Sequence, residues 1–140
     1  MSHGWWTKET ETRMLNDHLD EAMLIRLFTN PCSVTRATAL TSLTGIVSGY
    51  LGYAPIVIGV GSWTVTSADP YCYATAPSLL WTLMGSHGPI YGYYYTAANS
   101  DTYPMGCIER FSDGPYSMTR TGQQLSITPV LGARGVSSWM

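Results

Sequence analysis

The stretch that decides the fold is PIYGYYYTAANSDTYPMGCIERFSDGPYSM, residues 89–118. It contains two runs of strand-forming residues, PIYGYYYTAA (89–98) and MGCIERFS (105–112), each bounded by turn-forming residues. Aromatic and β-branched residues in such runs are typical of β-strands. The SDGP that follows (112–115) combines Asp, Gly and Pro in a pattern that favours a tight turn. The stretch therefore predicts strands joined by turns, with a hairpin-like corner near its end.

The same stretch concentrates Glu109, Arg110 and Asp113 in a chain with few charges, which raises the question of an active site. Successive side chains of a strand point to opposite faces. Glu109 and Arg110 therefore lie on opposite faces, and no regular structure holds Glu109 close to Asp113. We expect no catalytic carboxylate pair here. Arg110 is predicted to be a structural or interface ion-pair partner.

The composition favours one folded domain with a large protein interface. The chain has 140 residues, of which 45% are hydrophobic and 11% are charged, with a net charge of −2. A typical domain has about 25% charged residues, and a free monomer usually carries a more highly charged surface. The seven basic residues are scattered along the chain. Because nucleic-acid binding depends on clustered phosphate contacts, we expect no nucleic-acid partner.

Residues 7–23 predict the single helix of the chain. Thr7 or Thr10 can cap its N-terminus, and apolar residues recur at three- and four-residue spacing. After this segment the pattern changes to short strand-like runs bounded by Gly, Pro, Asn, Asp or Ser. Besides the two runs above, these are LIRLFTN (24–30), IVIGVGSWTVTS (56–67), APSLLWTLMG (76–85) and QLSITPVL (124–131).

One helix followed by strands at intervals of about 10–20 residues argues for an antiparallel sandwich or barrel. We predict a mainly β fold, an antiparallel β-sandwich of the jelly-roll-like kind, with one N-terminal α-helix and extended terminal arms. The single domain, 1–140, would comprise an N-terminal arm (1–6), the helix (7–23), the sandwich (24–131) and a C-terminal arm (132–140).

No enzyme or cofactor motif is recognisable. The three histidines are not paired by spacing with a nucleophile or a second ligand, and the nucleophile motif GxSxG is absent. Cys32, Cys72 and Cys107 lack CxxC spacing, so we expect small buried side chains and no metal site. GVGSW (59–63) lacks the dinucleotide and phosphate-loop patterns, and its glycines indicate a bulge or a close backbone approach within a strand. We expect no catalytic residue, no cofactor and no enzyme activity.

The first eleven residues lack the basic and apolar regions of a signal peptide, and Gly and Pro interrupt the longest apolar runs. We therefore expect neither a leader nor a membrane span.

The block YGYYY (91–95) allows two interpretations. In a strand, Tyr91, Tyr93 and Tyr95 share one face. Aromatic ladders bind sugars or stack on bases, although proteins that stack bases usually add a basic groove. Strand tyrosines more often pack in a core or a protein interface. We favour core or interface packing and keep glycan binding as the alternative.

Both ends of the chain combine Gly with Trp, in SHGWW (2–6) and GARGVSSWM (132–140). Solvated tails normally lack tryptophan, which is over-represented among the residues that dominate interface energies. We therefore expect both arms to lie on neighbouring subunits.

The segment IYGYYYTAANSDTYPMGCIERFSDGPYSMTRTGQQLSITPVL (90–131) resembles the C-terminal half of a widespread group of small virion proteins encoded by tailed phages. The first half fits that group loosely, through LIRLFTN (24–30) and GYA (52–54). The chain departs from the group at Pro55, where a basic residue is common, and in its extra GARGVSSWM tail. The resemblance implies a phage particle component with a β-sandwich core, no enzyme activity and no cofactor.

On this basis we expect a structural virion protein, assembled in the host cytoplasm, and preferably a capsid decoration or cement protein. Its partners would be the major capsid protein, other virion proteins and further copies of itself, with trimers suggested by the symmetry sites of capsids. The alternatives are a minor tail, neck, adaptor or fibre-associated subunit and, from a different class, a glycan-binding module. The predicted interface residues are Trp5, Trp6, Tyr93, Tyr95, Arg110 and Trp139.

Overall fold

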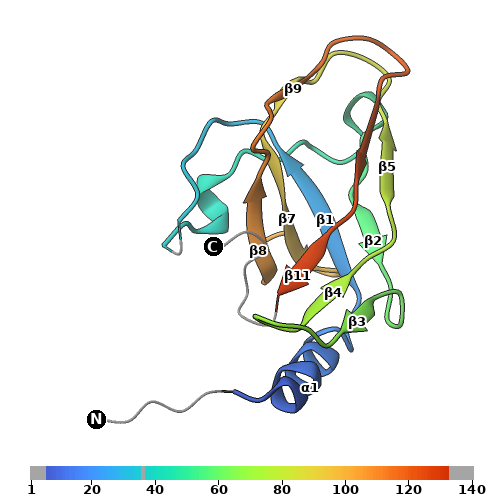
Figure 1. The fold of residues 1–140 in the computed structure, drawn as a ribbon. Coiled ribbons are helices and arrows are strands. Elements are labelled where there is room, and N and C mark those ends of the chain that lie inside the picture. The colour runs from blue at the N-terminus through green and yellow to red at the C-terminus, as the bar shows by residue number, and fades with distance from the viewer. Residues whose placement is uncertain (1–5, 36, 133–140) are drawn as a thin grey trace.

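The computed structural model describes residues 6–35 and 37–132, and within them the fold is mainly β with one α-helix (Figure 1). The elements are α1 (Lys8–His18), β1 (Met23–Phe28), the 3-10 helices η1 (Leu40–Ser42) and η2 (Tyr50–Gly52), β2 (Ile56–Ile58), β3 (Thr64–Thr66), β4 (Tyr73–Thr75), β5 (Leu79–Thr82), β6 (Gly88–Ile90), β7 (Gly92–Ala97), β8 (Pro104–Arg110), β9 (Tyr116–Met118), β10 (Gln124–Ile127) and β11 (Val130–Gly132). The strands pair in antiparallel fashion.

Helix α1 begins close to the predicted position but ends earlier. Thr7 is its N-cap, and the Thr7 Oγ1 accepts a hydrogen bond from the Thr10 N–H at 3.2 Å. The helix ends at His18 instead of residue 23, because Met23 already pairs with two neighbouring strands as part of β1. Within the described residues, no helix is long and apolar enough to cross a membrane.

A four-stranded sheet with the order β2-β1-β7-β8 forms one layer of the molecule. Within it, β1 pairs with β7 along its whole length. Ile25 and Leu27 point into the core and are fully buried. Phe28, on the opposite face of β1, is buried as well, and its ring lies 6.4 Å from that of Tyr94. The sheet is therefore covered on both faces at the end of β1, where Phe28 lies.

The chain from β4 to β11 forms one long antiparallel ribbon that is folded around the core. Its two arms pair strand by strand: β4 with β11, β5 with β10, β6 with β9 and β7 with β8. The registers are nested, from Thr75 opposite Val130 at the open end to Tyr94 opposite Ile108 near the tip. Breaks at Tyr91 and after β10 divide two of the predicted strands, PIYGYYYTAA and QLSITPVL, into two strands each.

The SDGP turn is a corner of this ribbon. β8 before the turn pairs with β7, whereas β9 after it pairs with β6. The predicted turn is present, but the strands on its two sides do not pair with each other. Tyr116 closes the corner: its ring centroid lies 4.7 Å from that of Phe111, and its hydroxyl donates a hydrogen bond to Asp113 Oδ1.

The prediction of one continuous strand over residues 56–67 is wrong. β2 pairs with β1, whereas β3 pairs with β4 in a different sheet. GVGSW (59–63) is the turn that separates them, and Gly61 adopts a φ of 84° there. Glycine adopts this left-handed conformation without a steric penalty. The chain therefore changes layer at GVGSW, where the sequence predicted a bulge or close approach within a strand.

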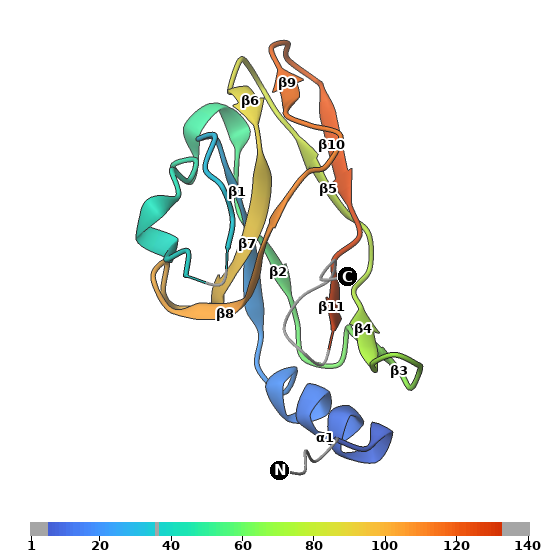
Figure 2. The same ribbon diagram turned by 60° about the vertical axis from the view of Figure 1, so that its left-hand side comes forward.

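Figure 2 shows the four-stranded sheet on one side of the core and β3, β4, β5, β10 and β11 on the other. One hydrophobic cluster fills the space between them and includes residues of every layer. Its largest members are Tyr53, Trp81, Tyr93 and Tyr95. Leu15 and Leu19, from α1 and its C-cap, belong to the same cluster, so the helix closes one end of the core (Figure 1).

A buried carboxylate fastens α1 to the sheet. Glu11 is only 3% exposed, and its Oε1 accepts a hydrogen bond from the Cys72 N–H at 3.0 Å. Cys72 is fully buried and lies with its Sγ 3.6 Å from Thr12 Oγ1. Lys8 and Asp69 add an exposed ion pair at 3.1 Å, a type of contact that contributes little to stability. The helix is therefore held mainly by Glu11 and its apolar residues.

Replacing Glu11 with Ala should lower the free energy of unfolding by about 1–3 kcal/mol, because the buried Cys72 N–H loses its acceptor. Urea denaturation followed by circular dichroism measures this change. Glu9→Ala is the matched control, since Glu9 lies in the same first turn and is exposed, and it should change stability by less than about 0.5 kcal/mol. Equal losses in the two variants would contradict the anchoring role of Glu11.

Gly92→Ala should also destabilise the fold, because β7 approaches its neighbours most closely there. A Cβ at Gly92 would lie 2.0 Å from the Glu109 carbonyl oxygen and 2.7 Å from the Phe28 ring. We expect a loss of about 1–3 kcal/mol, the usual range for overpacking, measured by thermal denaturation. In the control Gly59→Ala, the new Cβ would meet its nearest neighbour at 3.7 Å, an ordinary contact. Similar melting temperatures for the Gly92 and Gly59 variants would refute this packing argument.

Candidate interaction surface

Charged side chains are almost absent from the middle of the chain. Between residues 37 and 100, Asp69 is the only Asp, Glu, Lys or Arg, and it is paired with Lys8. The same segment holds seven of the ten exposed large hydrophobic side chains among the described residues. These seven are Val47, Tyr50, Leu51, Val57, Val60, Leu80 and Met84. Exposed apolar side chains in an uncharged setting mark candidate interaction sites.

The outer face of the β5–β10 pair carries two of these side chains. Alternation along β5 and the residues after it places Trp81 and Leu83 in the core, while Leu80 and Met84 are 53% and 63% exposed. The Trp81 Nε1 donates a hydrogen bond to the Ala54 carbonyl at 3.0 Å. Because the inner side chains are fixed in the core, the outer ones are presented from a rigid backbone.

The polar side chains of this face bond to one another. Gln124 Nε2 donates to Thr82 Oγ1 at 3.3 Å, and the hydroxyl oxygens of Ser78 and Thr128 lie 2.7 Å apart. Each pair connects the β5 side of the ribbon to the β10 side. A buried polar group costs less free energy when it already has a hydrogen-bond partner. This face could therefore be covered at a lower desolvation cost than a face of unpaired polar groups.

The η2 turn extends the uncharged surface beside Met84. Leu51 has a φ of 46°, and it is the only non-glycine residue in the described chain with a positive φ. Its carbonyl accepts a hydrogen bond from the Met84 N–H at 2.8 Å. A Cβ on Gly52 would lie 2.7 Å from Met84 Cγ, and one on Gly85 would lie 2.8 Å from Leu51 Cδ1. The two glycines therefore allow the Leu51 and Met84 side chains to pack against the chain at the surface.

Tyr50 adds an aromatic ring to this group. Its ring centroid lies 5.3 Å from that of His87, in an edge-on arrangement with an interplanar angle of 88°. Tyr50 belongs to the same 3-10 turn as Leu51 and is exposed. We define the neutral face as the six residues Tyr50, Leu51, Leu80, Thr82, Met84 and Gln124.

The six predicted interface residues lie in different environments. Trp6 is 58% exposed, and its contact with a partner stays a prediction. Trp5 and Trp139 lie outside the described residues. Tyr93 and Tyr95 are buried in the core, so the prediction that their side chains contact a partner is wrong. The reason is that β7 is an inner strand of its sheet, and this face of β7 is covered by the hydrophobic cluster.

The buried tyrosines have structural roles. The Tyr53 hydroxyl accepts a hydrogen bond from the Leu27 N–H at 3.1 Å, and burial raises the pKa of Tyr53 to about 12. Burial also raises the pKa of Tyr93, with a further contribution from the Glu109 carboxylate, and it raises the pKa of Tyr95. The Tyr93 and Tyr95 rings meet edge to face at 5.9 Å. These phenols are held neutral, which suits packing.

Arg110 contributes to the packing of β8, the edge strand of the four-stranded sheet. Its guanidinium lies 5.6 Å from the centre of the Tyr91 ring, and its Nη1 donates a hydrogen bond to the Cys32 carbonyl at 3.3 Å. Tyr91 thus lies with Arg110 and not in a ladder with Tyr93 and Tyr95, which corrects the predicted alignment of the three rings. The contacts of Arg110 join β8 to the loop that follows β1, and the ion pair that the sequence predicted for Arg110 stays a prediction.

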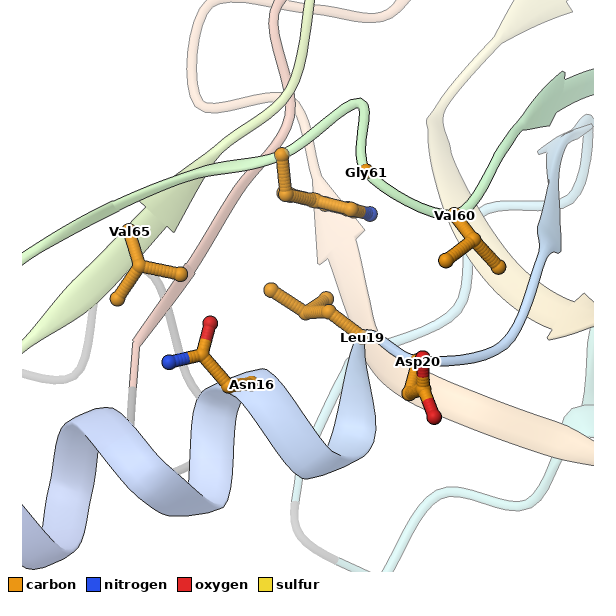
Figure 3. A pocket seen from close by; sticks show the side chains of 7 residues that line it. Asn16, Leu19, Asp20, Val60, Gly61 and Val65 are labelled. Atoms are coloured by element: carbon orange, nitrogen blue, oxygen red, sulfur yellow. The ribbon is translucent and has the colours of Figure 1, made fainter.

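A small pocket lies between the end of α1 and the turn that joins β2 to β3 (Figure 3). Its volume is about 290 Å³, at the lower end of the range for small-molecule sites. Its lining consists of Asn16, Leu19, Asp20, Val60, Gly61, Trp63 and Val65. The Trp63 Nε1 is buried and has no hydrogen-bond partner in the described chain, but it is closed to solvent, so a ligand in the pocket would not reach it. We assign no chemistry to this pocket.

No group of three or more His, Cys, Asp or Glu side chains is placed to hold a metal ion within residues 6–35 and 37–132. Of the three cysteines, only Cys72 is fully buried. The predicted burial of all three cysteines is therefore confirmed for Cys72 alone, while Cys32 and Cys107 are half-buried.

The buried tyrosines predict a loss of stability at alkaline pH. Their folded-state pKa lies above the ordinary value of 10.0, so folding favours the neutral phenol. This contribution is complete below about pH 10 and is lost as the pH rises towards the folded-state pKa, about 12 for Tyr53. Urea denaturation at a series of pH values should show a free energy of unfolding that falls above pH 10. The fall should be smaller in Tyr53→Phe than in Tyr103→Phe, which alters an exposed ring, and equal slopes would refute the assignment.

Comparison with protein-family models, with curated proteins and with solved structures gives no significant match to this chain. The candidate surface therefore has to be interpreted from its own residues and geometry.

Proposed function

We propose that this chain is a non-enzymatic structural component of a bacteriophage particle, and specifically a capsid decoration or cement protein. The observation that carries the proposal is the nearly uncharged surface of the segment 37–100, in which Asp69 is the one charged residue, with its seven exposed large hydrophobic side chains. The resemblance of residues 90–131 to small phage virion proteins points to the same role.

The chemistry of the neutral face suits a permanent contact better than a transient one. A soluble monomer gains from charges distributed over its surface, and this face has none. Its apolar side chains, led by Leu80 and Met84, gain free energy when they are covered. In a symmetric shell each such contact is repeated many times, so a weak individual contact adds up to strong retention.

The finer description of the fold belongs to this proposal. We infer an antiparallel β-sandwich of the jelly-roll-like kind, because a long nested ribbon is wrapped around one core and two layers face each other (Figure 2). Such a body is rigid, since each arm of the ribbon is fixed by the other. A rigid body loses little conformational entropy when it binds. The terminal arms, with Trp5, Trp6 and Trp139, would add contacts to the major capsid protein or to neighbouring copies.

A minor tail, neck or fibre-associated subunit is the second candidate within the same class, since the neutral face would serve any stable assembly. The glycan-binding alternative loses its main support. In that alternative, sugars would bind to the row of tyrosines Tyr91, Tyr93 and Tyr95. However, Tyr93 and Tyr95 are buried, and Tyr91 packs against Arg110.

The number of copies in purified particles tests the proposal. Quantitative mass spectrometry should find this chain in a fixed ratio to the major capsid protein, near one copy per capsid subunit. A decoration protein occupies every equivalent site of the shell, and this is the physical reason for the high ratio. A few copies per particle would overturn the decoration role in favour of a tail or neck position. Complete absence from the particle would overturn the structural role itself.

A further inference from the structure

The two layers of the molecule meet at two sides, and a short turn closes one of them. β2 and β3 are edge strands of their sheets, and GVGSW (59–63) joins them directly. The opposite edges are β8 in one layer and β11 in the other (Figure 2). β9 and β10 come between these two strands in sequence, so no direct turn joins them. The chain leaves β11 at Gly132 and continues through residues 133–140.

The Glu109 carboxylate lies on the inner face of β8, at this second side. Glu109 is the register partner of Tyr93, and side chains directly opposite each other in an antiparallel pair share one face. Tyr93 is buried in the hydrophobic cluster, and Glu109 is half-buried. Besides burial, the Glu109 carboxylate raises the pKa of Tyr93, which agrees with this closeness. A carboxylate removed from water in this way is stabilised by a cation that donates hydrogen bonds to it.

The position of Arg134 in the chain makes it the cation that suits Glu109. Arg110 points to the opposite face of β8, toward the loop that follows β1, and Arg36 belongs in sequence to that same loop. Arg134, in contrast, follows Gly132 of β11 by two residues, and β11 is the edge strand across from β8. The other basic residues lie on α1, on β1 and in the turn before β10, and these are Lys8, Arg13, Arg26 and Arg120.

The chain is long enough for this contact. Two extended residues span about 7 Å, and packed β-layers lie about 10 Å apart. The long side chain of Arg134 supplies the remaining reach. Gly132 and Gly135 stand on either side of the segment, and glycine allows the chain to change direction sharply.

We infer that Arg134 forms an ion pair with Glu109 of the same chain, and that this pair fastens the segment after β11 over the side between β11 and β8. The inference goes beyond the proposed function and does not depend on it. A guanidinium donates two parallel hydrogen bonds to a carboxylate, which makes arginine well suited to partly buried ion pairs. Trp139 follows Arg134 by five residues, so the pair also fixes the point from which the C-terminal arm extends.

A double-mutant cycle on the full chain tests the pair. Glu109→Gln and Arg134→Gln should each lower the melting temperature by several degrees, because each leaves the other charge without its partner. The double variant should lose no more than one single variant does. Glu109→Arg and Arg134→Glu should each be destabilised as well, and the chain that carries both reversals should recover most of the loss. Circular dichroism measures folding and melting of every variant.

Trypsin provides a second measurement, which reports on the segment itself. Trypsin cleaves after arginine, and mass spectrometry follows the bond between Arg134 and Gly135. Cleavage there should be slow in the wild type and several-fold faster in Glu109→Gln. Cleavage after Arg120, in the exposed turn before β10, is the internal reference and should keep its rate. Asp101→Asn is the matched control, since it removes an exposed carboxylate between β7 and β8 and should leave both rates unchanged.

Four results would overturn the inference. The first is a cycle in which the losses of the two Gln variants simply add, and the second is a cleavage rate after Arg134 that Glu109→Gln does not change. The third is coupling of Glu109 to Arg36, measured with Arg36→Gln, in place of Arg134. The fourth is recovery of stability in a mixture of the two charge-reversed single variants, which would place the pair between copies. None of these results alters the copy number expected in particles, so the proposed function stands or falls separately.

Discussion

The folded ribbon from β4 to β11 is the constraint on which the rest of the structure depends. A two-stranded antiparallel ribbon is at best marginally stable alone in water, so its apolar side chains need a second surface. The ribbon provides much of that surface itself, because it bends where its strands are interrupted. The bends bring Trp81 of β5, Tyr95 of β7 and Leu131 of β11 into one hydrophobic cluster. β1 then pairs with β7, and α1 covers the open end. Each strand pair of the ribbon is therefore stabilised by the other strand pairs that pack against it.

Strand-forming residues bounded by turn-forming residues predicted β5 and β8, and β5 has an inner and an outer face, with Trp81 inside and Leu80 outside. The same pattern could not show that residues 56–67 are divided. Both halves are rich in β-branched residues, and only their different partners, β1 and β4, separate them. Likewise, Met23 continues the apolar spacing of the helix, but pairing on both sides of β1 takes it into the sheet. Tertiary pairing overrides local propensity at such positions.

The candidate surface was only partly predictable for a related reason. Residue type predicted that aromatic side chains form the interface. Tyr93 and Tyr95 are instead buried in the core. The distribution of charge along the chain is a signal that sequence reasoning could have used, because a single charged residue between 37 and 100 leaves that part of the surface neutral. No pattern in the sequence predicted that Leu51 and Met84 lie side by side. It depends on a hydrogen bond between segments far apart in sequence and on the space left by two glycines.

The neutral face also bears on how strand edges are protected. Exposed strands are usually guarded against pairing with other chains by lysines, prolines or bulges. β5 and β10 form a two-stranded sheet, and their exposed side chains include Thr82, Gln124 and Ser126, which carry no charge. Charge repulsion therefore does not oppose association on this side of the molecule. Two acidic residues of α1, Glu9 and Asp17, lie elsewhere and are exposed to water. In the proposed assembly, this separation of charged and uncharged surface would give association one preferred direction and so favour a defined assembly over indiscriminate aggregation.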